Sequence, residues 1–296
     1  MSMKKLYALS ALLFIFILPT CRYTATKPQA DSSTQAPLQN PPLRFDEEIP
    51  QTPVELPNDT TEEPLEQTSP YWDVTTVDVS YISQERKLLS FTFDDAPSRQ
   101  LENLLAVFAG FNEQNPDCKA TATVFCNGYL FDETSAHTLS MSLALGWELG
   151  NHSYSHPDLT TLGLETLREE IEKTDEILYK LDGKKTHLFR PPYGRYDDAL
   201  RKACPTPIVN WTIDTLDWSG TSVDDIVEQV LTQKADGSIV LMHDNCPNTV
   251  EALKILLPKL KDEGYQVVSL SALAKMHQCA LKQGSVYIRA RKNGNG

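Results

Sequence analysis

Seven short apolar runs recur along residues 88–270 of this chain, and a segment with helical spacing of apolar residues follows most of them. Strands that alternate with helices are typical of a parallel α/β fold. Seven such units predict either a closed barrel or a doubly wound sheet. The apolar runs are Leu88–Phe93, Thr121–Cys126, Trp147–Asn151, His187–Arg190, Ile208–Thr212, Ser238–Met242 and Tyr265–Leu270.

Three segments between these runs have the spacing of amphipathic helices. The clearest is Leu164–Leu181, where apolar residues recur every three or four positions. A second helix is expected at Val223–Leu231, because Ser222 is a suitable N-cap. Val250–Leu260 is a third, although Pro258 leaves its C-terminal end open.

The N-terminus has the pattern of an export signal. Two lysines precede an apolar run, Leu6–Leu18, that is too short to span a bilayer comfortably and stops before Cys21. Cys21 occupies the place of a lipidated cysteine in a bacterial lipoprotein signal. A plain signal peptide or an uncleaved anchor are the alternatives. We therefore expect residues 1–21 to direct export, and an extracytoplasmic protein that is anchored in the membrane at the cell envelope.

Residues 22–70 carry nine of the 19 prolines, together with many Thr, Gln, Ser and Glu residues, and show no hydrophobic period. This composition predicts a disordered linker, which could hold a domain away from the bilayer. The catalytic domain is then expected at residues 71–280, followed by a C-terminal tail at 281–296.

The charge of the chain excludes one class of partner. The formal net charge is −13, and nucleic acid binding favours a basic surface, so we expect no nucleic acid partner. Eight of the acids lie between Asp46 and Glu66, where there is no base. We expect a monomer.

Cysteine spacing gives little further information. The six cysteines include no CxxC pair, and lipidation of Cys21 would leave an odd number. Cys126 lies in an apolar run and is expected in the core. Disulfide pairing stays open for Cys118, Cys204, Cys246 and Cys279.

Unusual polar residues follow five of the apolar runs. The C-terminal ends of parallel barrel strands share one face, where active sites form. The pattern therefore favours a barrel with a single site over scattered structural residues. The groups are Asp94 and Asp95; His152 and His156; Arg190, Tyr193 and Gly194; Asp214, Asp217 and Trp218; and His243 and Asp244.

His152 and His156 are candidate metal ligands. Pro157 disfavours helical backbone angles at His156, so this segment is expected to be a loop. Two imidazoles with a carboxylate make a common zinc set, and the adjacent Asp94 and Asp95 follow another strand. Two structural histidines would be the alternative if no carboxylate lay nearby. We treat His137, His187 and His277 as structural or surface residues.

Each other candidate has a structural alternative. Arg190 precedes a rigid Pro-Pro turn and could pair with a carboxylate in the site, or be a surface charge. Tyr193 and Trp218 could pack in the core instead of lining a pocket, and Asp214 could cap a turn. His243 ends an apolar strand and needs a partner.

Asp217 is the expected partner of His243. A carboxylate beside the imidazole would hold the ring and favour its protonated form.

The ordered motifs TFDDAP, HSYSH, RPPYG, DTLDW and LMHD resemble those of the polysaccharide deacetylases, carbohydrate esterase family four, over residues 85–275. The resemblance implies a distorted (β/α)7 barrel. It also implies a metal-dependent deacetylase of N-acetylated glycans, with Zn²⁺ as the first choice of metal and Co²⁺ as the second. One departure is Ala96, where the family usually has Gly; Ala fits if its φ is negative.

The resemblance also implies a role for each motif residue. It implies that Asp94 is the general base, that Arg190 orients Asp94, and that Asp95, His152 and His156 are the metal ligands. It implies that the backbone of Tyr193 binds the oxyanion and that Trp218 and Leu241 form the walls of the acetyl pocket. His243 would be the general acid, tuned by Asp217 with support from Asp214.

The export signal and linker favour an acetylated polysaccharide of the organism's own envelope as substrate, first of all N-acetylglucosamine in peptidoglycan. Chitin oligosaccharides, an exopolysaccharide and acetylxylan stay open, and muramic acid is a further alternative. A catalytically inactive glycan-binding barrel and a hydrolase of cyclic amides are the competing classes.

Overall fold

The computed structural model describes residues 69–291. The expected signal segment, Cys21 and nearly all of the expected linker lie outside these residues. The helices are α1 (Leu101–Gln114), α2 (Glu133–Ala144), α3 (Leu164–Asp182), α4 (Asp198–Ala203), α5 (Val223–Gln233), α6 (Pro247–Asp262) and α7 (Leu270–Met276). The strands are β1 (Lys87–Ala96), β2 (Thr123–Cys126), β3 (Glu148–Asn151), β4 (Ile208–Val209), β5 (Ile213–Asp214), β6 (Ser238–His243), β7 (Tyr265–Val267) and β8 (Val286–Tyr287).

Six of the described strands form a parallel sheet, and β4 and β8 form a second, two-stranded one that isolated bridges link to it, so that together they make an incomplete barrel. The order of the six-stranded sheet is β3-β2-β1-β6-β5, and β7 pairs with the start of β1. Phe189 forms single parallel bridges to Asn151 and to Ile208, which connects β3 to β4. The chain then passes from β4 directly into β5, which returns to β6. The expected distorted (β/α)7 barrel is confirmed.

Two of the expected strands differ from the sequence pattern. His187–Arg190 contributes only the bridging residue Phe189, because Pro191 and Pro192 follow without N–H donors. The expected strand Ile208–Thr212 is interrupted between β4 and β5. There the carbonyl oxygens of Val209 and Asn210 accept hydrogen bonds from Arg190.

Side chains alternate along β1 between two environments, as expected for a strand. Leu89, Phe91 and Phe93 pack against α1 and α6 in the main core, where Phe93 stacks on Trp147 with ring centroids 5.3 Å apart. The intervening positions face the barrel interior. Thr92 there accepts a hydrogen bond from Arg190. Because of this alternation, the side chain of Asp94, near the end of β1, points into the barrel interior.

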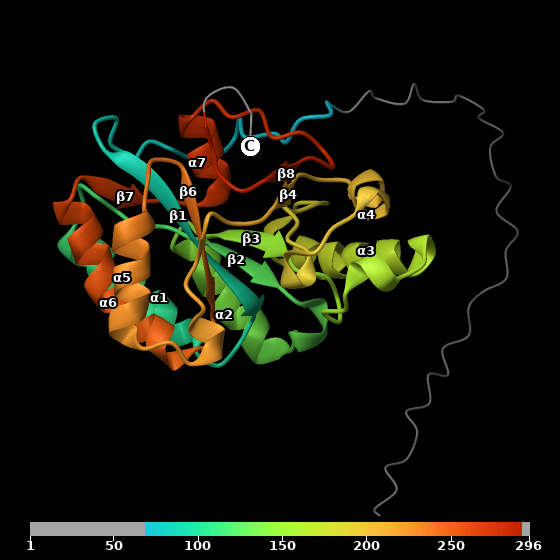
Figure 1. Cartoon of the computed structure of the whole chain (residues 1–296), viewed down its shortest axis with the longest axis horizontal. Coiled ribbons are helices and arrows are strands. Elements are labelled where there is room, and N and C mark those ends of the chain that lie inside the picture. Colours follow the sequence, from blue (N-terminus) through green and yellow to red (C-terminus); the bar gives the residue numbers. More distant parts are fainter. Residues whose placement is uncertain (1–68, 292–296) are drawn as a thin grey trace, which may run out of the picture. The chain divides into compact units, whose positions relative to one another are not determined.

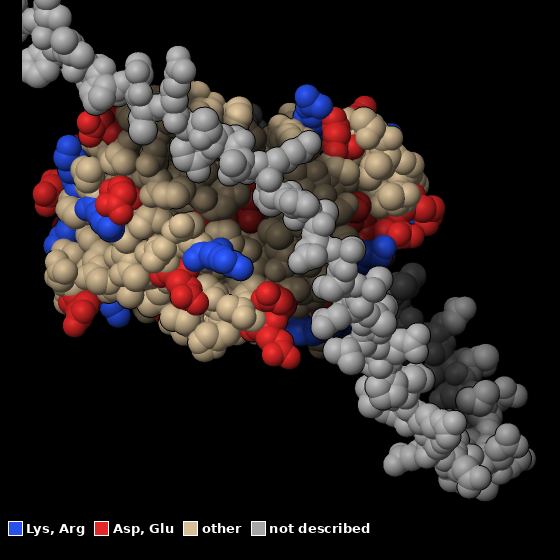
Figure 2. Space-filling view, turned by 90° about the horizontal axis from the view of Figure 1, so that it is seen from below, with Lys and Arg blue, Asp and Glu red and all other residues tan. Residues whose placement is uncertain are grey.

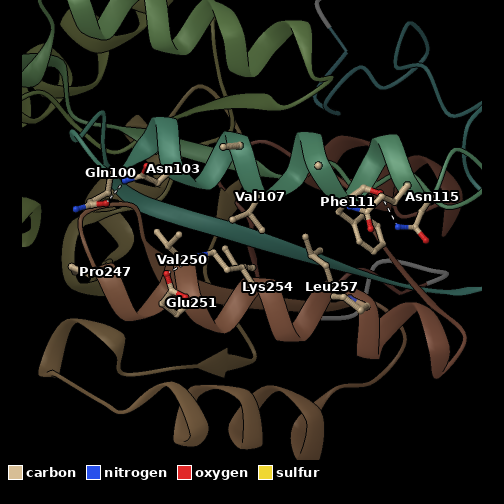
Figure 3. Close-up of a pocket in the computed structure, with 15 residues that line it drawn as sticks. Gln100, Asn103, Val107, Phe111, Asn115, Pro247, Val250, Glu251, Lys254 and Leu257 are labelled. Atoms are coloured by element: carbon tan, nitrogen blue, oxygen red, sulfur yellow. Dashed lines mark hydrogen bonds and ion pairs between the residues drawn. The ribbon is translucent and has the colours of Figure 1, made fainter.

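Helices α1, α5 and α6 lie together on one side of the sheet (Figure 1). A hollow of about 740 Å³ lies between α1 and α6, with Val107, Phe111, Val250 and Leu257 among its lining residues (Figure 3). This hollow includes none of the expected site residues. Figure 2 shows one face of the molecule, on which basic and acidic side chains are interspersed. Within residues 69–291, no helix has the length and apolar character needed to cross a membrane.

The expected tail is wrong for residues 281–291. Val286 and Tyr287 form β8, which pairs in parallel with β4. Leu281 and Ala290 are buried, and Tyr287 donates a hydrogen bond to the carbonyl of Ala280. Burial of these apolar side chains fixes the segment on the domain, so the packed unit extends beyond residue 280.

The expected helices and N-cap are present. The Leu164–Leu181 pattern corresponds to α3, and Ser222 caps α5 by accepting from the Asp225 N–H at 3.2 Å. Helix α6 continues through Pro258, whose side chain is exposed. Cys126 is buried as expected. Among the described residues, Cys118, Cys126, Cys204 and Cys246 carry free thiols.

Candidate active site

The two adjacent acids at the end of β1 point into one site because the strand regularity breaks between them. Asp94 continues the inward-facing register of β1 and lies opposite His243 of β6. Asp95 has φ of 63°, a left-handed conformation that is uncommon outside glycine. This turn brings a carboxylate oxygen of Asp95 within reach of the histidines on the β3 side. Ala96 is not among the residues of positive φ, so its side chain is tolerated.

Arg190 lies beneath Asp94 and is fully buried. Its Nη1 donates to Asp94 Oδ1 and to Thr92 Oγ1, both at 2.8 Å. Its Nε donates to the carbonyl of Val209 at 2.9 Å, and its guanidinium lies 4.2 Å from the centre of the Phe125 ring. The guanidinium is therefore held rigidly, and the sequence alternative of a surface charge is wrong.

Asp94 is ionised in this environment. Burial would raise the pKa of its carboxyl, but the nearby positive charges, first of all that of Arg190, outweigh burial and lower the pKa below its usual value. Its second oxygen, Oδ2, lies 3.6 Å from His152 Nε2. A carboxylate that is held ionised beside the candidate metal ligands suits a general base.

Asp95, His152 and His156 form the only candidate metal cluster among residues 69–291, with one ligand atom from each lying within 4.8 Å of the others. Asp95 Oδ1 lies 3.8 Å from His152 Nε2 and 3.4 Å from His156 Nε2. The other ring nitrogen of His152, Nδ1, lies 2.7 Å from the carbonyl oxygen of Arg190. A carbonyl can only accept, so Nδ1 carries the proton and Nε2 presents its lone pair to the cluster.

This donor set fits a divalent metal. Two imidazole nitrogens and one carboxylate oxygen are the ligands of many catalytic zinc sites, which keep a position for water. Burial and the neighbouring His152 lower the pKa of His156, which favours the neutral form that a ligand requires. The segment that carries both histidines is a loop, as Pro157 led us to expect.

His243 faces the pair of acids from the neighbouring strand. Its Nδ1 lies 2.7 Å from Asp217 Oδ1, and the other oxygen of Asp217 accepts from the His243 N–H at 2.8 Å and from Thr249 Oγ1 at 2.5 Å. Burial lowers the pKa of His243, but the bond to Asp217 and the charge of Asp94 more than compensate and raise it to about 9. His243 is therefore a cation at neutral pH and can act as an acid.

These residues surround a cavity of about 380 Å³. Leu241 is a buried wall residue, whereas Tyr193 and Trp218 are each 61% exposed, so neither aromatic packs in the core. Asp214 lines the cavity, and its carboxylate accepts from the Leu216 N–H at 2.9 Å, which is the turn-capping contact. The lining residues are Asp94, Asp95, His152, His156, Tyr193, Trp211, Asp214, Trp218, Leu241 and His243.

Tyr193 has φ of 60° and follows the Pro-Pro turn after Arg190. Its ring packs edge-on against His156, with centroids 4.8 Å apart. The tight turn therefore places both the backbone and the ring of Tyr193 beside the candidate metal ligands.

Sequence reasoning missed Trp211 and Thr249, and it noted Asp244 without assigning it a role. Trp211 lines the cavity, and its position just after β4 was the only available signal. Thr249 of α6 holds Asp217 through a contact between distant elements that no motif indicates. Asp244 is buried and accepts from the Ser98 N–H at 2.6 Å, which joins the loops after β6 and β1. Burial raises the pKa of Asp244 to about 8.

The three expected structural histidines lie outside the cavity. His187 is buried between Asp175 and Asp182, at 2.8 and 3.2 Å, and so connects the segment before Arg190 to α3. His277 lies 3.1 Å from Asp236.

Comparison with known proteins gives one family. Residues 82–205 match the family model described as polysaccharide deacetylase. The peptidoglycan-N-acetylglucosamine deacetylase of Bacillus cereus (strain ATCC 14579) is 33% identical over 192 residues, which are 62% of this chain and 67% of that protein. The peptidoglycan-N-acetylmuramic acid deacetylase of Bacillus subtilis (strain 168) is 33% identical over 195 residues, which are 66% of this chain. The match spans 40% of the length of the Bacillus subtilis protein.

The solved structures agree with this result. The structure of a family 4 acetyl xylan esterase from Clostridium thermocellum, in complex with a cobalt ion, superposes with a TM-score of 0.64 at 27% sequence identity. The superposition covers 69% of this chain and 98% of that one. The resemblance seen in the five motifs is thereby confirmed.

Proposed function

The chain belongs to the polysaccharide deacetylase family, and on that basis we propose that it is a metal-dependent hydrolase that removes N-acetyl groups from a cell-envelope polysaccharide. One arrangement carries the proposal: an ionised base, Asp94, and a protonated acid, His243, face the same cavity beside three metal-ligand side chains. An amide needs both a base for the attacking water and an acid for the leaving amine.

A divalent cation held by Asp95, His152 and His156 would act as a Lewis acid and lower the pKa of water. Zn²⁺ is our first choice because of the two imidazole ligands, with Co²⁺ as the alternative, which the cobalt complex of the Clostridium thermocellum esterase supports.

The side chains of this protein supply the proton transfers. Asp94, kept ionised by Arg190, accepts the proton of the attacking water. The backbone N–H of Tyr193 donates to the oxyanion that develops on the acetyl carbonyl; one such donor is typically worth roughly 10²–10³ in rate. His243, charged through Asp217, donates its Nε2 proton to the leaving nitrogen. Trp211, Trp218 and Leu241 exclude water around the acetyl methyl group.

The substrate that we propose first is N-acetylglucosamine in peptidoglycan, because one relative is named for that activity and the N-terminal sequence favours export. Two other relatives are named for muramic acid and for acetylxylan, so these glycans are the alternatives. An inactive glycan-binding barrel is disfavoured because Asp94, Arg190 and His243 are all present and mutually oriented.

Acetate release tests the proposal. The full chain, loaded with Zn²⁺ or Co²⁺, is incubated with purified peptidoglycan, chitin oligosaccharides and acetylxylan, and mass spectrometry identifies which sugar has lost its acetyl group. We expect acetate from peptidoglycan and free amines on its glucosamine units. Asp94→Asn should reduce the rate by roughly 10²–10⁴. Unchanged release by this variant would refute the base assignment, and full activity in the presence of a chelator would refute metal dependence.

We also propose that the protein is exported, anchored through Cys21 and monomeric. Export and anchoring are supported by the two lysines at the N-terminus, the short apolar run after them and the position of Cys21. A single chain brings the base, the acid and the three metal-ligand side chains together, which supports the monomer.

A further inference from the structure

The metal-ligand loop contains an unusual backbone conformation at His156. Its φ is 59°, a left-handed angle, and Pro157 follows directly. Such a conformation costs free energy in a residue with a side chain and persists only where neighbouring groups fix it. Ser153 Oγ accepts from the His156 N–H at 3.1 Å, but this bond lies within the same loop. Contacts from other elements must therefore hold the loop in place.

The first external contact comes from Glu170 of α3. One carboxylate oxygen accepts from the Ser155 N–H and the other from Ser155 Oγ, both at 2.7 Å. Hydrogen bonds to an ionised acceptor are stronger than neutral ones, and two of them fix orientation as well as position. Glu170 thus fixes the residue immediately before His156.

The second contact lies on the other side of His156. Asp158 Oδ2 lies 2.6 Å from Arg195 Nη1, and Asp158 Oδ1 accepts from Thr160 Oγ1 at 2.6 Å. The Arg195 guanidinium also lies 5.8 Å from the centre of the Tyr193 ring, which itself packs on the His156 ring. The loop with the metal ligand and the loop with Tyr193 are thus connected at the mouth of the cavity.

We propose that Glu170 and the Asp158–Arg195 pair are positioning residues that hold His156 in its left-handed conformation, with Nε2 directed at Asp95, and so set the affinity for the divalent metal. The inference rests on the proposed metal-dependent function. Residues that orient a metal ligand typically affect affinity by about 10–100-fold. Ser155 is exposed and the Arg195 side chain is 65% exposed, so these contacts lie outside the core. Their loss should weaken metal binding without unfolding the domain.

Helix α3 offers a matched control. Glu169 is adjacent to Glu170 but pairs with Lys173 at 3.1 Å, and both side chains are more than half exposed. Glu169→Gln changes the charge of the same helix by the same amount, and leaves the Ser155 contacts intact.

The experiment measures metal affinity of the full chain. Metal-free protein is titrated with Co²⁺ and with Zn²⁺ in competition with a chromophoric chelator, and thermal unfolding of the metal-free protein is followed in parallel. The variants are Glu170→Gln, Glu170→Ala, Arg195→Gln and the double change Glu170→Ala with Arg195→Gln. We expect about 10-fold weaker binding for Glu170→Ala and a greater loss in the double variant. Glu170→Gln should be intermediate, because its amide oxygen still accepts one bond from Ser155.

Glu169→Gln should bind both metals like the native protein, and all variants should keep the native unfolding temperature without metal. Affinities that match those of Glu169→Gln would overturn the proposal. A loss of affinity that accompanies an equal loss of metal-free stability would also overturn it, since the role would then be structural. If the native protein itself bound neither metal, the metal dependence in the proposed function would fail together with this inference; tight native binding with unaffected variants would refute this inference alone.

Discussion

The charge on His243 depends most on the neighbouring carboxylate of Asp217. Asp217 contacts both the ring and the backbone N–H of His243, and the pKa of His243 is raised to about 9. His243 is therefore protonated at any pH below about 9, including the range above 6.5 where an ordinary histidine is neutral, and the rate should fall as pH rises beyond about 9. In Asp217→Asn the pKa should drop towards the usual value, which moves the alkaline limb of the kcat/KM profile to lower pH.

Asp214→Asn is the matched comparison for this pH measurement. Asp214 lines the same cavity, but its carboxylate accepts from the Leu216 N–H, a contact that Asn can retain. We expect a much smaller displacement of the alkaline limb than in Asp217→Asn. Equal displacements would show that both acids tune His243, as the family resemblance implied for Asp214.

Arg190 stabilises the fold because it neutralises a buried carboxylate. In Arg190→Met, Asp94 would remain buried without its partner, which typically costs about 3–5 kcal/mol of unfolding free energy. The pKa of Asp94 is depressed in the native protein, so its contribution to stability is present at neutral pH and is lost as pH falls. Urea unfolding at pH 7 should show the full loss, and the difference from the native protein should narrow at lower pH.

An exposed arginine provides the control for this stability measurement. Arg168 on α3 lies 3.8 Å from Glu165, and both side chains are largely solvent-exposed. Arg168→Met should change the unfolding free energy by less than about 1 kcal/mol. A similar small effect for Arg190→Met would contradict the role that we assign to the buried pair.

Among the secondary-structure elements, β3 supports the site through Gly150, where the absence of a side chain leaves room for the Phe125 ring. A Cβ on Gly150 would lie 2.5 Å from Cδ1 of the Phe125 ring, and that ring supports the guanidinium of Arg190. Gly150→Ala should therefore displace Phe125 and destabilise the protein by about 1–3 kcal/mol, the usual cost of overpacking. Chemical denaturation measures the loss, and kcat should fall because Arg190 moves with the ring.

Gly163 gives a control for the added methyl group. Nothing lies within 4 Å of a Cβ built at this position, and its φ is −69°. Gly163→Ala should leave kcat unchanged. If Gly150→Ala also left stability and kcat unchanged, the ring could shift freely and would not fix the arginine.

The elements also explain which parts of the site were predictable. Asp94, His152, Arg190 and His243 follow apolar runs, and parallel strands bring such ends to one face, so spacing alone was informative. The left-handed turn at Asp95 was not predictable, because it depends on the surrounding structure and not on residue type.

Contacts between distant elements were equally hidden. Thr249 donates a hydrogen bond to Asp217, which lies 32 positions earlier in the sequence. Glu170 accepts a hydrogen bond from Ser155 of the metal-ligand loop, although the sequence pattern places Glu170 on the solvent-exposed face of its helix. Residues 281–291 lack a strong hydrophobic period, so they read as a tail, although burial of a few apolar side chains fixes them to the barrel. Periodicity therefore identified the alternating strands and helices of the fold, but not the contacts that position its catalytic groups.

At the scale of the whole molecule, the residues that line the cavity and the residues of the expected export signal lie in different segments of the chain. Every residue that lines the cavity lies between Asp94 and His243, and the packed domain extends to about residue 291. The charged start, the apolar run and Cys21 all lie before residue 22. A chain restricted to residues 69–291 should therefore retain native kcat/KM on soluble chitin oligosaccharides, if these are substrates of the full chain. If the full chain is anchored as we propose, the shortened chain should not fractionate with membranes.

Cys21→Ala in the full chain separates lipid attachment from the other effects of truncation. If Cys21 is lipidated, this variant should leave the membrane fraction but keep the kcat/KM of the full chain on soluble substrate. On insoluble peptidoglycan in intact cells, both altered proteins should release less acetate, because a tethered enzyme has a higher local concentration near its substrate than a free one. Continued membrane association of Cys21→Ala would point to an uncleaved anchor at Leu6–Leu18 instead. A large fall in kcat/KM of the truncated chain on soluble substrate would show that residues 1–68 contribute to the reaction itself.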